Sequence, residues 1–233
     1  LPAETNDDFL NRLAEKWKRS GDLLHNAPGT TLKEDGRTFN CRDAYIEALR
    51  HNPECGPAWG RLAVCTRARE TIPVNGIRRS KIECGRLALK YDTENADGWY
   101  TIGSFNDGKV ELDGSNASSV VVHDGVEFTP LQCYLKALEF DPDHSCSWHC
   151  LGDLAGEAEG GTIEIFGKRY TQLQASRQSL VLNITSFTSW CNMGTLIPRN
   201  SSITVDDTEY TELDCCRHAL EKCQRHSFEV WTF

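Results

Sequence analysis

The sequence predicts a mainly helical protein: an α-solenoid of stacked antiparallel helix pairs, with short β-hairpins along one edge. All six tryptophans recur at spacings of 42, 40, 49, 42 and 41 residues, at Trp17, Trp59, Trp99, Trp148, Trp190 and Trp231. A helix-start residue recurs 19 or 20 residues before the next tryptophan, at Asn40, Ser80, Thr129, Thr171 and Thr211. Because two independent marks keep one spacing, we expect a single repeat array over residues 1–233.

The repeat boundaries follow from these marks. We place full copies at residues 8–53, 54–93, 94–142, 143–184 and 185–225, with a partial sixth copy at 226–233. The chain begins without Met, and it stops where a further copy starts. We therefore expect it to be a segment of a longer protein.

Each copy contains a predicted β-hairpin. Short runs of β-branched and aromatic residues flank turn residues that tolerate positive φ, within residues 31–39, 74–76, 120–128, 163–170 and 203–210. Asp35-Gly36, Asn75-Gly76 and Asp124-Gly125 are the clearest turns, and such pairs are typical of two-residue hairpin loops. The copy before Ser80 has almost no recognisable first strand.

A capped helix follows each hairpin directly. Three positions after each helix-start residue comes an acid or glutamine, at Asp43, Glu83, Gln132, Gln174 and Asp214, which predicts five capping boxes. An aromatic residue precedes four of these caps, and we expect it to pack as a hydrophobic staple on the small residue four positions after the cap. That position holds Ala or Cys in every copy, at Ala44, Cys84, Cys133, Ala175 and Cys215. Alternation of Cys with Ala predicts small buried side chains.

The tryptophan begins a second kind of helix. Four residues after it comes Gly or Ala, at Gly21, Ala63, Gly103, Gly152 and Gly194, which lets a neighbouring helix approach closely. The runs W-x-x-L-G and C-Y-L-K-A-L-E-F-D-P resemble the tetratricopeptide repeat over essentially the whole chain. The resemblance implies a right-handed superhelix in which the tryptophan helix is the first of each repeat. The copies depart from it by exceeding 34 residues, the surplus being the hairpin.

Composition limits the function. With 34 acidic against 25 basic residues, the net charge of −9 disfavours nucleic acid, and no apolar run is long enough to span a membrane. Eleven cysteines, several at packing positions, favour a reducing cytoplasm. The sequons at Asn116, Asn183 and Asn200 leave open a secreted, disulfide-rich helical repeat protein.

Motifs for chemistry are weak. Two groups have metal-ligand types: Cys215, Cys216, His218, Cys223 and His226, and His144, Cys146, His149 and Cys150. Each group lies within one short stretch, whereas zinc usually draws ligands from two elements. The sequence contains no G-x-S-x-G nucleophile elbow, no H-E-x-x-H zinc-protease motif, no phosphate-binding loop and no dinucleotide-binding fingerprint. We expect that the chain has no enzymatic activity and binds neither a metal nor a cofactor.

The expected function is that of a non-catalytic scaffold, which binds a peptide or helix of a partner protein in the concave groove. The resemblance implies that the first helices line that groove, which makes the candidate peptide-binding residues Lys18, Asp22, Arg67, Tyr100, His149 and Asp153. The alternative is an assembly segment that self-associates through its hairpins or repeat ends.

Overall fold

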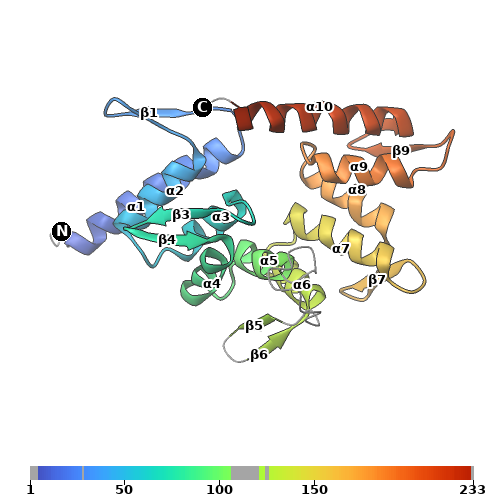
Figure 1. Cartoon of the computed structure of the whole chain (residues 1–233). Coiled ribbons are helices and arrows are strands. Elements are labelled where there is room, and N and C mark those ends of the chain that lie inside the picture. Colours follow the sequence, from blue (N-terminus) through green and yellow to red (C-terminus); the bar gives the residue numbers. More distant parts are fainter. Residues whose placement is uncertain (1–4, 28, 106–120, 124–125, 232–233) are drawn as a thin grey trace. The chain divides into compact units, whose positions relative to one another are not determined.

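The computed structural model describes residues 5–27, 29–105, 121–123 and 126–231, and it gives side chains there except in 121–123 and 222–231. Its described part is mainly helical, with small antiparallel strand pairs (Figure 1). The helices are α1 (Asn6–His25), α2 (Cys41–His51), α3 (Gly56–Cys65), α4 (Lys81–Tyr91), α5 (Ala96–Phe105), α6 (Pro130–Phe140), α7 (Ser145–Glu157), α8 (Gln172–Leu182), α9 (Phe187–Leu196) and α10 (Glu212–Trp231).

In the described part, one hairpin lies between the two helices of each of the five copies. The paired strands are β1 (Leu32–Glu34) with β2 (Arg37–Phe39), β3 (Thr71–Val74) with β4 (Ile77–Ser80), β5 (Val121–His123) with β6 (Val126–Phe128), β7 (Thr162–Ile165) with β8 (Lys168–Thr171), and β9 (Ser202–Val205) with β10 (Thr208–Thr211). Asp35 and Asn75 adopt positive φ, as the sequence predicted, and each is followed by a positive-φ glycine. The predicted turn at Asp124-Gly125 lies outside the described residues.

One strand prediction was wrong. The hairpin before Ser80 has a complete four-residue first strand, β3, in which Pro73 pairs with Arg78. A proline is tolerated there because a two-stranded ribbon has only edge strands. The buried side chains Ile72 and Val74 alternate with exposed neighbours, so β3 has the period of a half-buried strand.

The capping boxes are confirmed in all five copies. The Asn40, Ser80 and Thr171 side chains each accept a hydrogen bond from the backbone three residues on, and the residue there bonds back to the cap. The same reciprocal bonds join Thr129 with Gln132 and Thr211 with Asp214. The helices therefore begin where the sequence placed them.

The chain divides into two compact units, Leu1–Cys133 and Tyr134–Phe233. In the first unit α1 packs on α2, α2 on α3, α3 on α4 and α5, and α4 on α5. In the second unit α7 packs on α8, α8 on α9, and α9 on α10. Neighbouring helices thus pack in sequence order within each unit, and one continuous superhelix through both remains a prediction.

Tryptophans organise the core of each unit. Trp17, Trp59, Trp99, Trp148 and Trp190 are all buried. Four of them contact the aromatic residue that precedes the following helix, with ring centroids 4.8–5.2 Å apart, in the pairs Trp17–Phe39, Trp99–Phe128, Trp148–Tyr170 and Trp190–Tyr210. The ring of each predicted staple residue thus lies against the ring of the preceding tryptophan. The Trp231 side chain lies outside the described part.

Two of the hairpins pack on a helix of the preceding copy. At the tip of the second hairpin, the Asn75 side-chain amide donates to the Leu49 carbonyl of α2 at 2.9 Å. In the second unit, Arg177 Nε of α8 donates to the Thr204 carbonyl of β9 at 2.5 Å. Each of these hairpins therefore fastens one repeat to the one before it.

The last helix continues past the copy boundary at residue 225: α10 runs from Glu212 to Trp231 without interruption (Figure 1). At the four earlier helix ends, an Asn or Asp side chain accepts a hydrogen bond from the backbone two residues on, at Asn52, Asp92, Asp141 and Asn183. The fifth copy has Cys223 at this position. Without a side chain that competes for backbone hydrogen bonds, the helical pattern continues.

Candidate functional site

The predicted binding residues form two pairs, one in each unit. On α1, Lys18 Nζ lies 3.4 Å from Asp22 Oδ2. On α7, His149 Nε2 lies 3.5 Å from Asp153 Oδ2. Each pair spans four residues of a first helix, so both side chains of a pair lie on one helix face.

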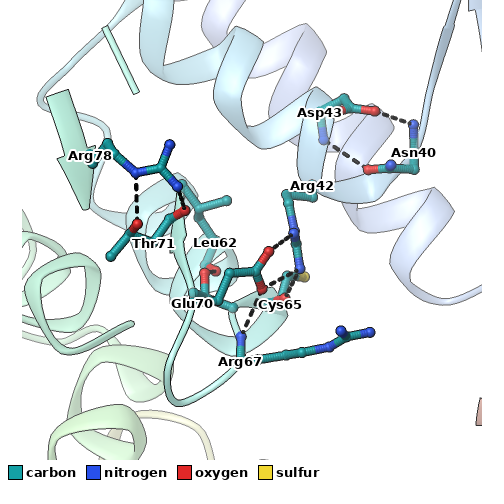
Figure 2. A network of polar contacts seen from close by, with 10 residues as sticks. Asn40, Arg42, Asp43, Leu62, Cys65, Arg67, Glu70, Thr71 and Arg78 are labelled. Carbon is teal, nitrogen blue, oxygen red and sulfur yellow. Dashed lines mark hydrogen bonds and ion pairs between the residues drawn. The ribbon is translucent and has the colours of Figure 1, made fainter. Parts of the chain in front are cut away.

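The other two candidates lie on other elements of unit one. Arg67 follows α3, is exposed, and points its guanidinium away from the neighbouring polar network (Figure 2). Tyr100 on α5 is half-buried, and Lys81 Nζ lies 5.9 Å from its ring centroid. Four of the six candidates thus belong to unit one and two to unit two.

A row of charged groups crosses the first helices of unit one. Asp22 Oδ1 accepts a hydrogen bond from the Tyr45 hydroxyl at 3.0 Å, and Arg61 Nε of α3 lies 3.7 Å from the same oxygen. Arg61 Nε also lies 3.3 Å from Asp97 Oδ2 of α5. Lys18, Asp22, Arg61 and Asp97 thus link α1, α3 and α5, and we call them the first-helix row of unit one.

A matching row occurs in unit two. Asp153 Oδ1 accepts a hydrogen bond from Asn192 Nδ2 of α9 at 2.7 Å. His149 Nδ1 lies 3.4 Å from the Ser189 hydroxyl, also of α9. These four residues are the first-helix row of unit two.

The two rows share one register. The carboxylate comes five residues after a tryptophan, at Asp22 and Asp153, and its cross-helix donor comes two residues after the next tryptophan, at Arg61 and Asn192. The donors Arg61 and Asn192 were not among the residues predicted from the sequence. A donor two residues after a tryptophan, paired with an acid in the preceding copy, is the pattern that could have identified them.

A second cluster lies where three helices end. His25 is the last residue of α1, Cys41 the first of α2, and Cys65 the last of α3. Their donor atoms all lie within 4.8 Å of one another, and Cys65 Sγ is 3.7 Å from His25 Nδ1. All three residues are half-buried. We call this group the thiol–imidazole cluster.

Hydrogen bonds within the cluster shift the pKa values of its two cysteines in opposite directions. The Cys65 thiol bonds to Cys41 Sγ and, with His25 and the Arg42 backbone, holds the pKa of Cys41 well below its usual range. The same interaction with Cys41, together with burial, raises the pKa of Cys65. The lowered pKa favours the thiolate of Cys41, which is the form that binds metals and attacks electrophiles.

Arg42, the residue after Cys41, bonds to the main chain of Cys65 (Figure 2). Its Nη2 donates to the Cys65 carbonyl at 2.8 Å, which ties the start of α2 to the end of α3. The same guanidinium makes a two-pronged contact with Glu70, at 2.6 and 3.1 Å. Paired bonds of this kind hold an arginine in one orientation.

The group of metal-ligand residue types near residue 215 serves packing in its described part. Cys215 is fully buried, and the His218 ring stacks on Trp190 with centroids 4.8 Å apart. The side chains of Cys223 and His226 lie outside the described residues. In the second group, His144 Nδ1 accepts from the Ser147 backbone at 3.2 Å and so caps α7.

Comparison with known proteins gives no relative: no family model matches this chain, and no curated protein matches it. Among the described helices, none is both long and apolar enough to cross a membrane. The geometry of the two rows and of the thiol–imidazole cluster therefore carries the functional interpretation.

Proposed function

We propose that this chain is a non-catalytic protein-interaction scaffold that binds an extended peptide or a helix of a partner protein along its first helices. The observation that carries the proposal is the recurrence of the first-helix row in both units, in one register. The resemblance to tetratricopeptide repeats supports it, because first helices line the binding groove in that family.

The exposure of the row suits it to binding. The side chains of Lys18, Asp22 and Arg61 retain 22%, 32% and 39% of their exposure, so a ligand can reach their polar ends. Ion pairs of this exposure contribute about 0–1 kcal/mol to stability, so redirecting one charge toward a ligand costs little. The row carries both signs, which suits a peptide that presents backbone carbonyl and amide groups as well as charged side chains.

The experiment is affinity capture with the whole chain, followed by quantitative mass spectrometry. We expect Arg61→Ala, Asp153→Lys and Arg67→Glu to lower the recovery of at least one partner protein. Arg86→Glu is the matched control, because Arg86 is exposed on α4, the second helix of its repeat. Recovery that is unchanged in all three groove variants would overturn the groove site.

One observation supports the alternative function, self-association. Leu213 and Leu220 are 68% and 65% exposed, and their seven-residue spacing places them on one face of α10. Exposed apolar side chains on one face suit contact with another protein surface. If a second copy covers them, the mass measured by light scattering rises with concentration, and Leu220→Glu abolishes that rise.

We further propose that the chain works in the cytoplasm. The adjacent thiols of the thiol–imidazole cluster are free, as are those of Cys55, Cys84, Cys133, Cys215 and Cys216. A reducing compartment keeps such thiols unpaired. A thiol titration of the denatured, unreduced protein purified from its native cells tests this: eleven reactive thiols support it, and three or fewer favour the secreted alternative.

A further inference from the structure

We infer that the ends of α1, α2 and α3 form a metal site, in which His25, Cys41 and Cys65 bind one thiophilic divalent ion, best matched by Zn²⁺. This site is independent of the proposed peptide-binding surface, and either can fail without the other.

The geometry fits a tetrahedral ion. With Zn–S bonds of about 2.3 Å and Zn–N bonds of about 2.0–2.1 Å, neighbouring ligand atoms of a tetrahedron lie about 3.6–3.8 Å apart. Cys65 Sγ and His25 Nδ1 already lie 3.7 Å apart. The remaining separations are no more than 4.8 Å, so rotamer adjustments that shorten them by about 1 Å complete the triangle.

The ligands also have suitable chemistry and origins. Two thiolates and one imidazole favour Zn²⁺ over Mg²⁺ and Ca²⁺, which prefer oxygen ligands. The three residues come from three helices, separated by 16 and 24 positions in the chain. An ion bound here joins elements that are otherwise connected through one hairpin, β1–β2, and the turn between α2 and α3, and a water molecule completes the fourth position.

The packing of the repeat does not require these residue types. In unit two, the residue eight positions after Trp148 is Gly156, and a Cβ added there would meet the side chain of Gln172, the first residue of α8. Gly156 and Gln172 thus occupy the places that His25 and Cys41 occupy in unit one. The last residue of α9, in the place of Cys65, is Leu196.

This internal comparison distinguishes a metal site from ordinary core packing. The same helix-end junction is built from glycine, glutamine and leucine in unit two, so histidine and two cysteines are not needed to close it. Their coincidence in unit one therefore indicates a ligand that the other junction lacks.

Cobalt substitution tests the site in the full-length chain. The reduced protein is freed of metal with a chelator and titrated with Co²⁺ under anaerobic conditions. We expect a thiolate-to-cobalt charge-transfer band and intense visible bands of tetrahedral Co²⁺, saturating at one equivalent. One equivalent of Zn²⁺ is expected to remove these bands.

Single substitutions assign the ligands. Cys41→Ser, Cys65→Ser and His25→Asn are each expected to remove or strongly weaken the charge-transfer band. Cys55→Ser is the matched control, because Cys55 is another half-buried cysteine of the same unit, outside the cluster. The proposal is overturned if the wild-type chain shows no such band, if the band survives in both cluster cysteine variants, or if Cys55→Ser removes it.

A measurement on the wild-type chain guards against variants that do not fold. Zn²⁺ should slow alkylation of Cys41 and Cys65 by iodoacetamide at least tenfold, and leave Cys55 unaffected, as located by peptide mass spectrometry. Equal rates with and without Zn²⁺ at Cys41 and Cys65 would reject the site without recourse to any substitution.

Discussion

The indole nitrogen of Trp59 donates a hydrogen bond to the main-chain carbonyl of Pro53 at 2.8 Å. Three further tryptophans bond to the carbonyl six residues earlier in the same way, at 2.8–2.9 Å, in the pairs Trp99–Thr93, Trp148–Pro142 and Trp190–Ile184. Each of these tryptophans thus fills the core with its ring and fixes the turn before its own helix. The repeated tryptophan is a packing residue and a turn clamp at once.

Loss of this bond should be measurable. Trp59→Phe removes the donor, and the loss of this one hydrogen bond costs about 0.5–1.5 kcal/mol beyond the lost ring contacts. The control is Trp17→Phe in the same unit, because Trp17 lies within α1 and makes no such bond among the described residues. Urea denaturation should show Trp59→Phe less stable by about 1 kcal/mol than Trp17→Phe. Equal losses of unfolding free energy in the two variants would show that the Trp59–Pro53 hydrogen bond does not stabilise the turn.

The effect on stability of replacing the glycine four residues after a tryptophan depends on the side chain that packs against it. A Cβ added at Gly21 would lie 2.5 Å from Cε1 of Tyr45, whose buried ring is held by its hydroxyl bond to Asp22. Alanine there gains about 1 kcal/mol of helix propensity but overpacks the interface, which costs about 1–3 kcal/mol. We expect Gly21→Ala to lower the thermal midpoint.

Gly152 provides the comparison at the same repeat position. An added Cβ there would lie 3.3 Å from Ala175 Cβ, a tight contact that a small shift relieves. Gly152→Ala should therefore change stability by less than about 0.5 kcal/mol, since propensity and crowding nearly cancel. A larger loss for Gly152→Ala than for Gly21→Ala in calorimetry would show that the Tyr45 contact does not limit the first site.

The capping box of α4 should lower the pKa of Glu83 measurably. Hydrogen bonds from the Ser80 backbone and hydroxyl hold the pKa of Glu83 below its usual value of 4.5. Since the folded-state pKa is lowered, the stabilisation is complete above pH 4.5 and is lost as pH falls through the lowered value. Carbon-detected NMR of the Glu83 carboxyl should give a midpoint below 4.5.

Ser80→Ala separates the two bonds to Glu83. The variant lacks the hydroxyl donor at 2.7 Å but keeps the backbone donor at 2.8 Å. The pKa of Glu83 should therefore rise and still remain below 4.5. A pKa that does not move in Ser80→Ala would mean that the hydroxyl makes no contribution to the box.

Local patterns predicted local structure well. The hairpin turn at Asn75 and the cap at Asn40 depend on a few neighbouring residues, so their conformations follow from the sequence alone. The burial of Cys84 and Cys215 followed from comparing copies, because Cys alternates there with Ala. Repeat periodicity was the poorer guide at the end of the fifth copy, where α10 continues past residue 225 and Cys223 stands where the other copies have Asn or Asp.

Contacts between distant helices were not predictable in the same way. The approach of His25 to Cys41 and Cys65 depends on how three helix ends meet, and no short motif links them. Arg61 was missed for a related reason, because its partners belong to the copies before and after its own. Such contacts need the helix packing as well as the repeat register.

The Arg42–Glu70 pair should couple more strongly than an ordinary surface ion pair. Its two hydrogen bonds join α2 to the segment after α3, and both side chains are about two-thirds buried, with exposures of 30% and 32%. Two-pronged geometry and partial burial favour a coupling of about 1 kcal/mol. A double-mutant cycle of Arg42→Ala and Glu70→Ala, measured by chemical denaturation, gives this value.

The cycle also isolates the pair from the other bond of Arg42. Arg42→Ala additionally loses the donor to the Cys65 carbonyl, but that loss occurs with or without Glu70 and cancels in the coupling term. Lys16–Glu34 is the control pair, since it has a single contact and the lysine side chain is 52% exposed. Its coupling should stay below about 0.5 kcal/mol. Equal couplings for the two pairs would show that Arg42 does not clamp the end of α3 through Glu70.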